Sequence, residues 1–227
     1  MRRDAKLVIR RDFKRPDTAT VASFAGQATG PVVDAMGRRG ALSPALKAVT
    51  SKDRFCGPAL TVWTAPRDNL APYSALAFAK PGDVLVIQVG GPDEVAIFGD
   101  IAIGMAKNAG VAAVVTDGYV RDRESLEAIG IPVIAAGLTP NSPFKNGPGE
   151  IGGTVAIGGV AVEAGDILIG DADGVAVVPW RDAAATRERL DKVLAKEAEM
   201  ERVVAGGAAR PAWIDDVLTG EGVIYVD

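Results

Sequence analysis

The sequence predicts a mixed α/β fold, and two patterns in the chain predict this class. Between residues 83 and 137, continuous apolar runs alternate with segments whose apolar residues recur at helical spacing. After residue 153, short apolar runs follow one another with turn residues between them. The first pattern indicates a parallel α/β unit with right-handed crossovers, and the second indicates further short strands.

The strands and helices before residue 138 follow from these patterns. Apolar runs predict strands at residues 58–65, 83–90, 111–118 and 131–137. Helical spacing predicts helices at residues 17–37, 101–110 and 123–130, and the segment 68–82 is expected to hold a short helix that Pro81-Gly82 ends. The run at 83–90 is almost entirely apolar, so we expect a central strand that is covered on both faces.

The first helix carries its own boundary signals. Asp17 or Thr18 can cap its N-terminus, because short polar side chains accept hydrogen bonds from the first free backbone N–H groups. Gly30-Pro31 is expected to divide the helix into two pieces.

The rest of the chain predicts a loop, short strands and a long helix. Residues 90–100 and 138–153 are punctuated by glycine and proline and predict loops. Residues 181–204 predict a charged amphipathic helix. The tail after this helix carries apolar side chains that need burial, namely Trp213, Ile214, Val217, Leu218, Ile224 and Tyr225.

We expect one domain over residues 1–227, because no linker is long enough to divide the chain. The basic residues of the segment 1–16 predict a solvated N-terminal arm. The C-terminal helix and tail, residues 181–227, are expected to pack on a neighbouring subunit, since the tail's apolar residues need a surface to cover them.

The composition excludes several chemistries. The chain has 227 residues, a formal net charge of -4 and no histidine. Without histidine there is no Ser-His-Asp or Cys-His catalysis and no zinc site built on imidazole. A metal site must therefore use oxygen ligands, which suits Mg²⁺ or Mn²⁺. The negative net charge argues against a nucleic-acid partner.

The compartment is expected to be the cytoplasm. The single cysteine, Cys56, cannot form an internal disulfide, and we expect it to fill a buried apolar position. The basic arm lacks the apolar core of a secretory signal. No segment offers the roughly 18 consecutive apolar residues of a membrane span, so no membrane partner is expected.

Three charged residues are candidates for a common site. Asp100 follows the loop after one central strand, and Arg121-Asp122 follow the next strand. Ligands of such folds bind at the carboxyl ends of strands, where loops and helix N-termini meet. Arg121 could grip a carboxylate or a carbonyl oxygen, Asp122 could hold a cation, and Asp100 could position a proton-carrying water.

Each of these residues also has an ordinary structural explanation. Asp100 and Asp122 both precede predicted helices and are candidate N-caps. Arg121 can be a surface residue in an ion pair, and Asp117-Gly118 is a common turn dipeptide. The spacing alone therefore leaves both explanations open.

The stretch "FGDIAIGMAKNAGVAAVVTDGYVRDRESLEAIGIPVIAAGLTP", together with the preceding "CGPALTVWTAPRDN", resembles the RraA-like family. The enzymatic branch of that family comprises class II 4-hydroxy-4-methyl-2-oxoglutarate aldolases, which also decarboxylate oxaloacetate. Its signature is an aspartate, twenty intervening residues and Arg-Asp, which this chain matches with Asp100 and Arg121-Asp122. The resemblance covers roughly residues 17–205.

The resemblance implies a role for each residue of the motif. Asp122 resembles the aspartate that anchors the metal, and Arg121 resembles the arginine that binds pyruvate and stabilises its enolate. Asp100 resembles the aspartate near the water that carries the proton. The residues that resemble the loop whose amides receive the substrate carboxylate are Gly99, Asp100, Ile101 and Ala102.

The resemblance extends to two residues further along the chain. The stretch "SPFKNGPGEIGG" resembles the aldolase stretch "GPVK…LG", which implies that Lys145 is a second contact for the anionic substrate. A glutamate from the C-terminal helix of a neighbouring subunit completes the family's site, and Glu197 is the best match, with Glu199 and Glu201 as alternatives. A surface charge is the ordinary explanation of Glu197.

The family resemblance also implies a fold and an assembly. The fold is an α-β-β-α sandwich of the swivelling β/β/α type, and the assembly is a homotrimer or hexamer with active sites between subunits. Two departures bear on the preferred substrate: Phe98 stands where the family often has tryptophan, and "TAPRDNLAPYSAL" lacks a histidine that some aldolases carry.

The sequence therefore predicts a lyase that depends on Mg²⁺ or Mn²⁺ and acts on a small 2-oxo acid. It would cleave a 4-hydroxy-2-oxo acid to pyruvate and decarboxylate oxaloacetate through the same enolate. The alternative is a regulatory protein of the RraA type, which inhibits ribonuclease E without catalysis. A methyltransferase is disfavoured, because "GGPDEVAIFGD" is not a G-x-G-x-x-G cofactor fingerprint.

Overall fold

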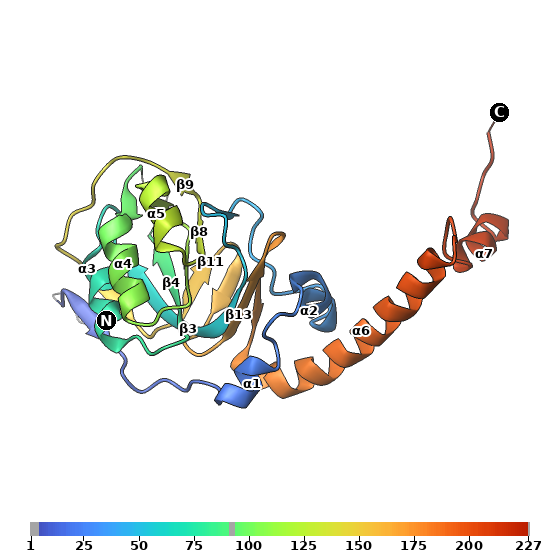
Figure 1. Cartoon of the computed structure of the whole chain (residues 1–227), viewed down its shortest axis with the longest axis horizontal. Coiled ribbons are helices and arrows are strands. Elements are labelled where there is room, and N and C mark those ends of the chain that lie inside the picture. The colour runs from blue at the N-terminus through green and yellow to red at the C-terminus, as the bar shows by residue number, and fades with distance from the viewer. Residues whose placement is uncertain (1–4, 91–93, 227) are drawn as a thin grey trace. The chain divides into compact units, whose positions relative to one another are not determined.

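The computed structural model describes residues 5–90 and 94–226 (Figure 1). The chain divides into two compact units, residues 1–190 and 191–227, and each is described by itself. Within the described residues, the first unit contains a nine-stranded sheet with the order β1-β10-β3-β4-β6-β8-β2, to which β13 and β14 attach through β3.

The main sheet consists of β1 (Leu7–Ile9), β2 (Lys47–Ala48), β3 (Phe55–Thr64), β4 (Val84–Val89), β6 (Ala113–Thr116), β8 (Val133–Ala135), β10 (Gly149–Ile151), β13 (Ile167–Asp171) and β14 (Gly174–Val178). Two smaller sheets consist of β5 (Ala96–Phe98), β7 (Tyr119–Val120) and β9 (Gly137–Leu138), and of β11 (Val155–Ile157) and β12 (Val160–Val162). The helices of the first unit are α1 (Thr18–Ala22), α2 (Thr29–Ala35), α3 (Leu70–Ala75), α4 (Asp100–Asn108) and α5 (Arg123–Ile129), with the 3₁₀ turns η1 (Leu76–Phe78) and η2 (Trp180–Asp182).

The centre of the sheet is parallel and apolar on both faces. The strands β3, β4, β6 and β8 pair in parallel, as the crossover pattern predicts. In β4, Leu85 and Ile87 belong to one buried cluster, whereas Val84 and Val86 belong to the other. Alternate side chains point to opposite faces of a strand, so a strand covered on both sides needs apolar residues at every position. The predicted central strand is confirmed.

The two buried clusters define the layers. Helices α3, α4 and α5 lie on one face of the central strands β4, β6 and β8, and the other face is covered by β11 and by β13, which belongs to the same sheet through β3 (Figure 1). Helix α2 contacts β13 and β14 and forms the outer layer on that side. The arrangement is a mixed α/β fold of the α-β-β-α kind, which confirms the predicted fold class.

The N-terminal arm is not simply solvated, which corrects the expectation for residues 1–16. The described part of the arm contains β1, which pairs in parallel with β10. Arg15 donates two hydrogen bonds to the buried carboxylate of Asp83, at 2.9 and 2.7 Å. The apolar triplet Leu7–Ile9 completes an edge of the sheet, and burial of Asp83 requires a cationic partner.

The first predicted helix divides earlier than expected. Asp17 caps α1 by accepting the N–H of Thr20 at 2.8 Å, as predicted. The break falls between α1 and α2, before Gly30-Pro31, and Pro31 lies in the first turn of α2, where its missing N–H is not needed. The N-terminus of α2 is capped from a distance, because the Asp171 carboxylate accepts the N–H and the hydroxyl of Thr29, both at 2.8 Å.

The predicted loops contain short strands. β5 lies within the expected loop 90–100, of which residues 91–93 fall outside the described residues, and β10 lies within the expected loop 138–153. These strands span three residues each, too few for an alternating pattern to emerge from the sequence. They form because neighbouring strands offer them backbone partners.

Cys56 is half-buried in β3, and its Sγ donates to the carbonyl oxygen of Val21 at 3.5 Å. Burial raises the pKa of the thiol to about 11. The thiol is therefore protonated at neutral pH and a poor nucleophile, although Cys56 is only partly buried and not fully buried as expected.

Helix α6 (Ala183–Ala205) begins in the first unit and continues into the second. The second unit also contains α7 (Trp213–Thr219). The long helix predicted at 181–204 is confirmed. Side chains of the tail are exposed in the single chain, with 59% of Trp213 and 85% of Ile224 accessible. Their burial on a neighbouring subunit stays a prediction, as does the single-domain organisation.

In the part of the chain that the structure describes, no helix is long and apolar enough to cross a membrane.

Candidate functional site

The small parallel sheet β5-β7-β9 determines where the candidate residues lie. Each of its strands follows one central strand: β5 comes after β4, β7 after β6 and β9 after β8. The register pairs Phe98 with Val120 and Val120 with Leu138. Residues that follow these three positions therefore emerge side by side, although they are far apart in the sequence.

Backbone hydrogen bonds continue this alignment beyond the strands. The N–H of Arg121 donates to the carbonyl oxygen of Phe98 at 3.1 Å, and the N–H of Thr139 donates to that of Val120 at 3.1 Å. The start of α4, the Arg121-Asp122 pair and the segment after β9 thus form one edge of the molecule.

Asp122 joins the three predicted residues. Its Oδ2 accepts the backbone N–H of Asp100 at 3.2 Å and the Nε–H of Arg121 at 3.3 Å. The side chains of Arg121 and Asp122 are 37% and 35% exposed, so both can meet a ligand. The structure brings Asp100, Arg121 and Asp122 together, as the spacing predicts.

Neither Asp100 nor Asp122 caps the helix that follows it with its side chain, although the structural explanation of these residues expected such a cap. Gly99, rather than Asp100, is the N-cap of α4, and Asp100 is the first helical residue. Asp122 is the N-cap of α5, but its side chain makes no capping hydrogen bond there and reaches the N-terminus of α4 instead. Asp122 also has a positive φ of 63°, a conformation that is uncommon outside glycine and costs about 1 kcal/mol or more.

Gly99 is required by close packing. A Cβ atom at this position would lie 2.3 Å from Oδ2 of Asp122 and 3.0 Å from Nε of Arg121. The φ of Gly99 is -128°, which any residue can adopt, so the requirement comes from the neighbouring side chains. Gly99 is predicted from the sequence to offer an amide, and the structure adds this steric role.

Two amides of the predicted carboxylate-binding loop already have acceptors. The N–H of Asp100 donates to Asp122, and the N–H of Ile101 donates to Oδ1 of Asp100 at 2.7 Å. Ala102 is buried, whereas the side chain of Ile101 is 65% exposed. Carboxylates thus already occupy the positive end of the α4 dipole, which shows that this helix end accepts anions.

Ser142 is a site residue that the sequence analysis missed. Its Oγ accepts a hydrogen bond from Nη1 of Arg121 at 2.6 Å. A serine in a loop rich in proline and asparagine carries no signal of its own. A cavity of about 250 Å³ opens beside this contact and is lined by Arg121, Asp122, Arg123, Leu138, Thr139 and Pro140.

Lys145 connects to the site through two aromatic rings. Its Nζ lies 5.9 Å from the ring centroid of Tyr73, and the Tyr73 ring packs edge-on against Phe98 at 5.5 Å. Phe98 immediately precedes Gly99. The predicted contact of Lys145 with an anionic substrate stays a prediction, and Tyr73 is a second residue that the sequence analysis missed.

Glu197 lies on the part of α6 that belongs to the second unit, and its side chain is exposed. The prediction assigns it to the site of a neighbouring subunit, which a single chain does not contain. Its role therefore stays a prediction.

The carboxylate of Asp122 is an oxygen donor of the kind that could bind a hard divalent cation. Among the described residues there is no group of three or more His, Cys, Asp or Glu side chains placed to hold a metal ion. Magnesium ordinarily binds proteins through one or two carboxylates, and water and substrate complete its coordination. Asp122 can supply one such carboxylate, but the residues here do not suit a zinc site held entirely by protein ligands.

Asp117 lies beneath the site, at the ends of the central strands. Its Oδ1 accepts the N–H of Val89 at 2.7 Å, which ties the end of β4 to the residue that follows β6. Burial raises the pKa of this carboxyl above its ordinary value, and the hydrogen bonds only partly offset the effect. Asp117 is therefore not only a turn residue, because its side chain also connects the ends of β4 and β6.

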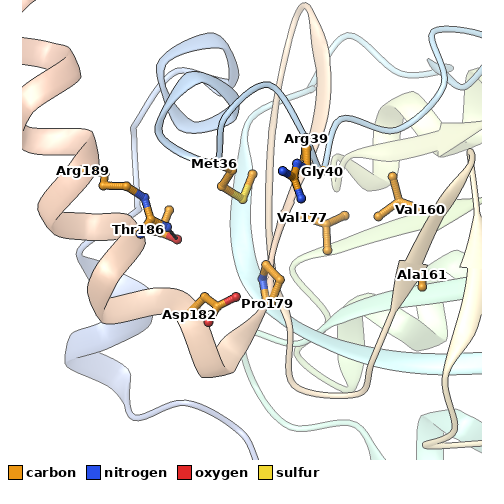
Figure 2. Close-up of a pocket in the computed structure, with 10 residues that line it drawn as sticks. All are labelled: Met36, Arg39, Gly40, Val160, Ala161, Val177, Pro179, Asp182, Thr186 and Arg189. Atoms are coloured by element: carbon orange, nitrogen blue, oxygen red, sulfur yellow. Dashed lines mark hydrogen bonds between the residues drawn. The ribbon is translucent and has the colours of Figure 1, made fainter.

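A second cavity, of about 290 Å³, lies between α2, β12, β14 and the start of α6 (Figure 2). Arg189 lines it and donates to the carbonyl oxygen of Ala35 at 2.6 Å and to Oγ1 of Thr186 at 2.9 Å. The bond to Ala35 joins α6 to the C-terminal end of α2, so Arg189 has a structural role that needs no ligand. None of the residues predicted from the motif lines this cavity. We therefore place the function at the site formed by Asp100, Arg121 and Asp122, which is called the Arg121 site below.

Taken together, the fold and the site define an α-β-β-α protein that presents one arginine and two carboxylates at the ends of parallel strands. Residues 29–177 match the family model described as RraA-like, Aldolase/RraA. The chain belongs to the RraA-like family.

Relatives in this family carry two kinds of name. A protein of Halalkalibacterium halodurans named "Putative 4-hydroxy-4-methyl-2-oxoglutarate aldolase" is 36% identical over 185 residues, which cover 82% of this chain and 88% of that protein. The crystal structure of Streptomyces coelicolor RraAS2, described as an unusual member of the RNase ES inhibitor RraA family, is similar with a TM-score of 0.74 and 30% identity. The match covers 85% of this chain and 98% of that one. The RNA-processing inhibitor RraA from Thermus thermophilis is 31% identical with a TM-score of 0.63, and the match covers 67% of this chain and 93% of that one.

Proposed function

We propose that the protein is a lyase that depends on Mg²⁺ or Mn²⁺ and cleaves a 4-hydroxy-2-oxo acid of the 4-hydroxy-4-methyl-2-oxoglutarate type to pyruvate. Decarboxylation of oxaloacetate is proposed at the same site. The observation that carries the proposal is the convergence of Arg121, Asp122 and Asp100 at one edge of the sheet. The aldolase-named relative at 36% identity supports it.

The reaction needs a place for negative charge on the substrate. In aldol cleavage the 4-hydroxyl group loses its proton and the C3–C4 bond breaks. The electrons of that bond form the enolate of pyruvate, which then takes a proton at C3. Loss of CO₂ from oxaloacetate breaks the corresponding C3–C4 bond and leaves the same enolate, so one charge-stabilising site serves both reactions.

Each residue of the site has its own role in the proposed reaction. Arg121 donates hydrogen bonds to the developing oxyanion through its planar guanidinium. Asp100 holds the water that carries the proton to and from the substrate. Asp122, with the Glu197 of the partner subunit, would hold the divalent cation, which supplies Lewis-acid polarisation of the 2-oxo group when it is bound. Gly99 and Ala102 offer backbone N–H groups to the substrate carboxylates, Ile101 does so by exchanging its bond to Oδ1 of Asp100, and Lys145 offers a cation.

A substrate panel tests the function. Purified protein is incubated with oxaloacetate and several 4-hydroxy-2-oxo acids, with added Mg²⁺ or Mn²⁺ and with EDTA, and pyruvate release is measured. We expect release that depends on the added cation. An equal rate in EDTA would contradict the proposed metal dependence.

Substitution of Arg121 tests the site itself. We expect Arg121→Ala to lower kcat/KM by about 10²- to 10³-fold, by comparison with the loss of one oxyanion donor. The fold should persist, because the side chain is partly exposed and packs in no buried cluster. Steady-state kinetics give the first result and circular dichroism the second. Full activity in this variant would remove Arg121 from the mechanism.

The similarity to RraA structures supports a second candidate, a regulatory protein that binds and inhibits ribonuclease E. Two assays distinguish the lyase from the regulatory protein. Absence of pyruvate release from every acid of the panel, together with inhibition of ribonuclease E in a cleavage assay, would favour the regulatory role.

A further inference from the structure

The guanidinium of Arg121 is held on two sides by protein atoms. Its Nε donates to Oδ2 of Asp122 at 3.3 Å, and its Nη1 donates to Oγ of Ser142 at 2.6 Å. The second contact is the shorter of the two, and its partner is an uncharged hydroxyl. Ser142 follows β9, so the contact joins two of the three segments that form the site.

The backbone around Ser142 is fixed independently of Arg121. Oγ1 of Thr139 and Nδ2 of Asn141 both donate to the carbonyl oxygen of Glu94, at 3.1 and 2.9 Å. The N–H of Ala96 in turn donates to the carbonyl oxygen of Asn141 at 3.1 Å. These bonds tie the segment before Ser142 to the start of β5. The hydroxyl of Ser142 is therefore presented from an anchored segment.

A fixed acceptor matters because arginine is a long and flexible side chain. Arg121 is partly exposed, and an exposed arginine samples many rotamers unless its donors are held. A charged group that must stabilise a developing oxyanion works best when it is already in place. The two contacts leave Nη2 as the guanidinium nitrogen without an acceptor among the described residues, so this nitrogen can meet a ligand.

We infer that Ser142 is a positioning residue, which holds Arg121 through Nη1 so that Nη2 faces the reacting oxygen. The inference rests on the proposed function for its catalytic consequence.

Three variants test the inference. Ser142→Ala removes the acceptor, Ser142→Thr keeps a hydroxyl at the same carbon, and Ser43→Ala removes a hydroxyl that accepts the N–H of Ala45, away from the site. The Nε–Hε NMR signal of Arg121, assigned by its loss in Arg121→Lys, reports the position of the guanidinium without any substrate. Pyruvate release reports catalysis.

We expect Ser142→Ala to shift the Arg121 signal and to lower kcat about tenfold, because one hydrogen bond to a charged group is lost, with KM nearly unchanged. Ser142→Thr should restore both, and Ser43→Ala should alter neither. An unchanged Arg121 signal in Ser142→Ala would overturn the inference, as would a loss of kcat that threonine does not rescue. If the unaltered protein releases no pyruvate, the proposed function fails, and the NMR signal still decides whether Ser142 positions Arg121.

Discussion

At the scale of single residues, close contacts between side chains decide how the site is built. The carboxylate of Asp122 lies against the first turn of α4 only because residue 99 has no side chain. The sequence motif indicated that residues 100, 121 and 122 belong together, since their spacing follows consecutive strands. It did not indicate that Asp122 adopts a positive φ or that its Oδ2 bonds both Asp100 and Arg121.

Substitution of Gly99 tests this contact. We expect Gly99→Ala to displace the Asp122 carboxylate and to lower kcat/KM by roughly 10- to 100-fold, since small misplacements of catalytic groups have effects of this size. The matched control is Gly104→Ala in the same helix, where a Cβ atom would meet only Ile129 Cδ1 at 4.0 Å. That change should preserve activity and stabilise the fold by about 0.5–1 kcal/mol, because alanine is the better helix former. Kinetics and thermal unfolding of both variants measure the difference, and equal activity in the two would contradict the steric role.

At the scale of elements, the site depends on strands of two or three residues. β5, β7 and β9 pair in parallel and align the residues that follow them. Beneath them, Asp117 ties the ends of the longer strands β4 and β6 together through Val89. The site is thus supported by a short sheet and by one carboxylate whose burial raises its pKa.

The raised pKa of Asp117 makes stability depend on pH. Between the ordinary pKa of the carboxyl and its raised value, the folded protein binds more protons than the unfolded chain, so stability falls as pH rises through this window. Asn at this position keeps an oxygen for the N–H of Val89 and cannot become charged. We expect Asp117→Asn to raise the urea midpoint at about pH 7, and we expect this gain to shrink as pH falls through the raised pKa and the aspartate takes up its proton. A variant that is less stable at every pH value would show that the charged carboxylate itself stabilises the strand ends.

At the scale of the whole molecule, the first unit forms the layered body and contains the Arg121 site. The second unit carries Glu197 and exposed apolar side chains. We propose that these side chains are covered in a homotrimer or hexamer, in which Glu197 completes the site of a neighbouring subunit. Several large apolar side chains of this unit are exposed in the single chain, among them Trp213 and Ile224, which supports this assembly.

Complementation between two defective variants tests the shared site. Arg121→Ala and Glu197→Gln should each be nearly inactive alone. After unfolding and reassembly together, about a quarter of the sites would combine an intact Arg121 with an intact partner Glu197, if subunits mix at random. We expect activity near that fraction in the mixture, and light scattering gives the oligomeric state. Activity no higher than that of the separate variants would indicate that Glu197 acts elsewhere.

The sequence by itself determined the α/β class, the central strands with their crossovers and the spacing of Asp100, Arg121 and Asp122. These features depend on local periodicity and on the rule that parallel strands end at one edge, both of which are written in consecutive residues. Only the tertiary structure decided that Leu7–Ile9 joins the sheet, that Gly99 admits Asp122 and that Ser142 holds Arg121. Those contacts join segments far apart in the chain, and their energies come from hydrogen bonds and close packing that no local pattern encodes.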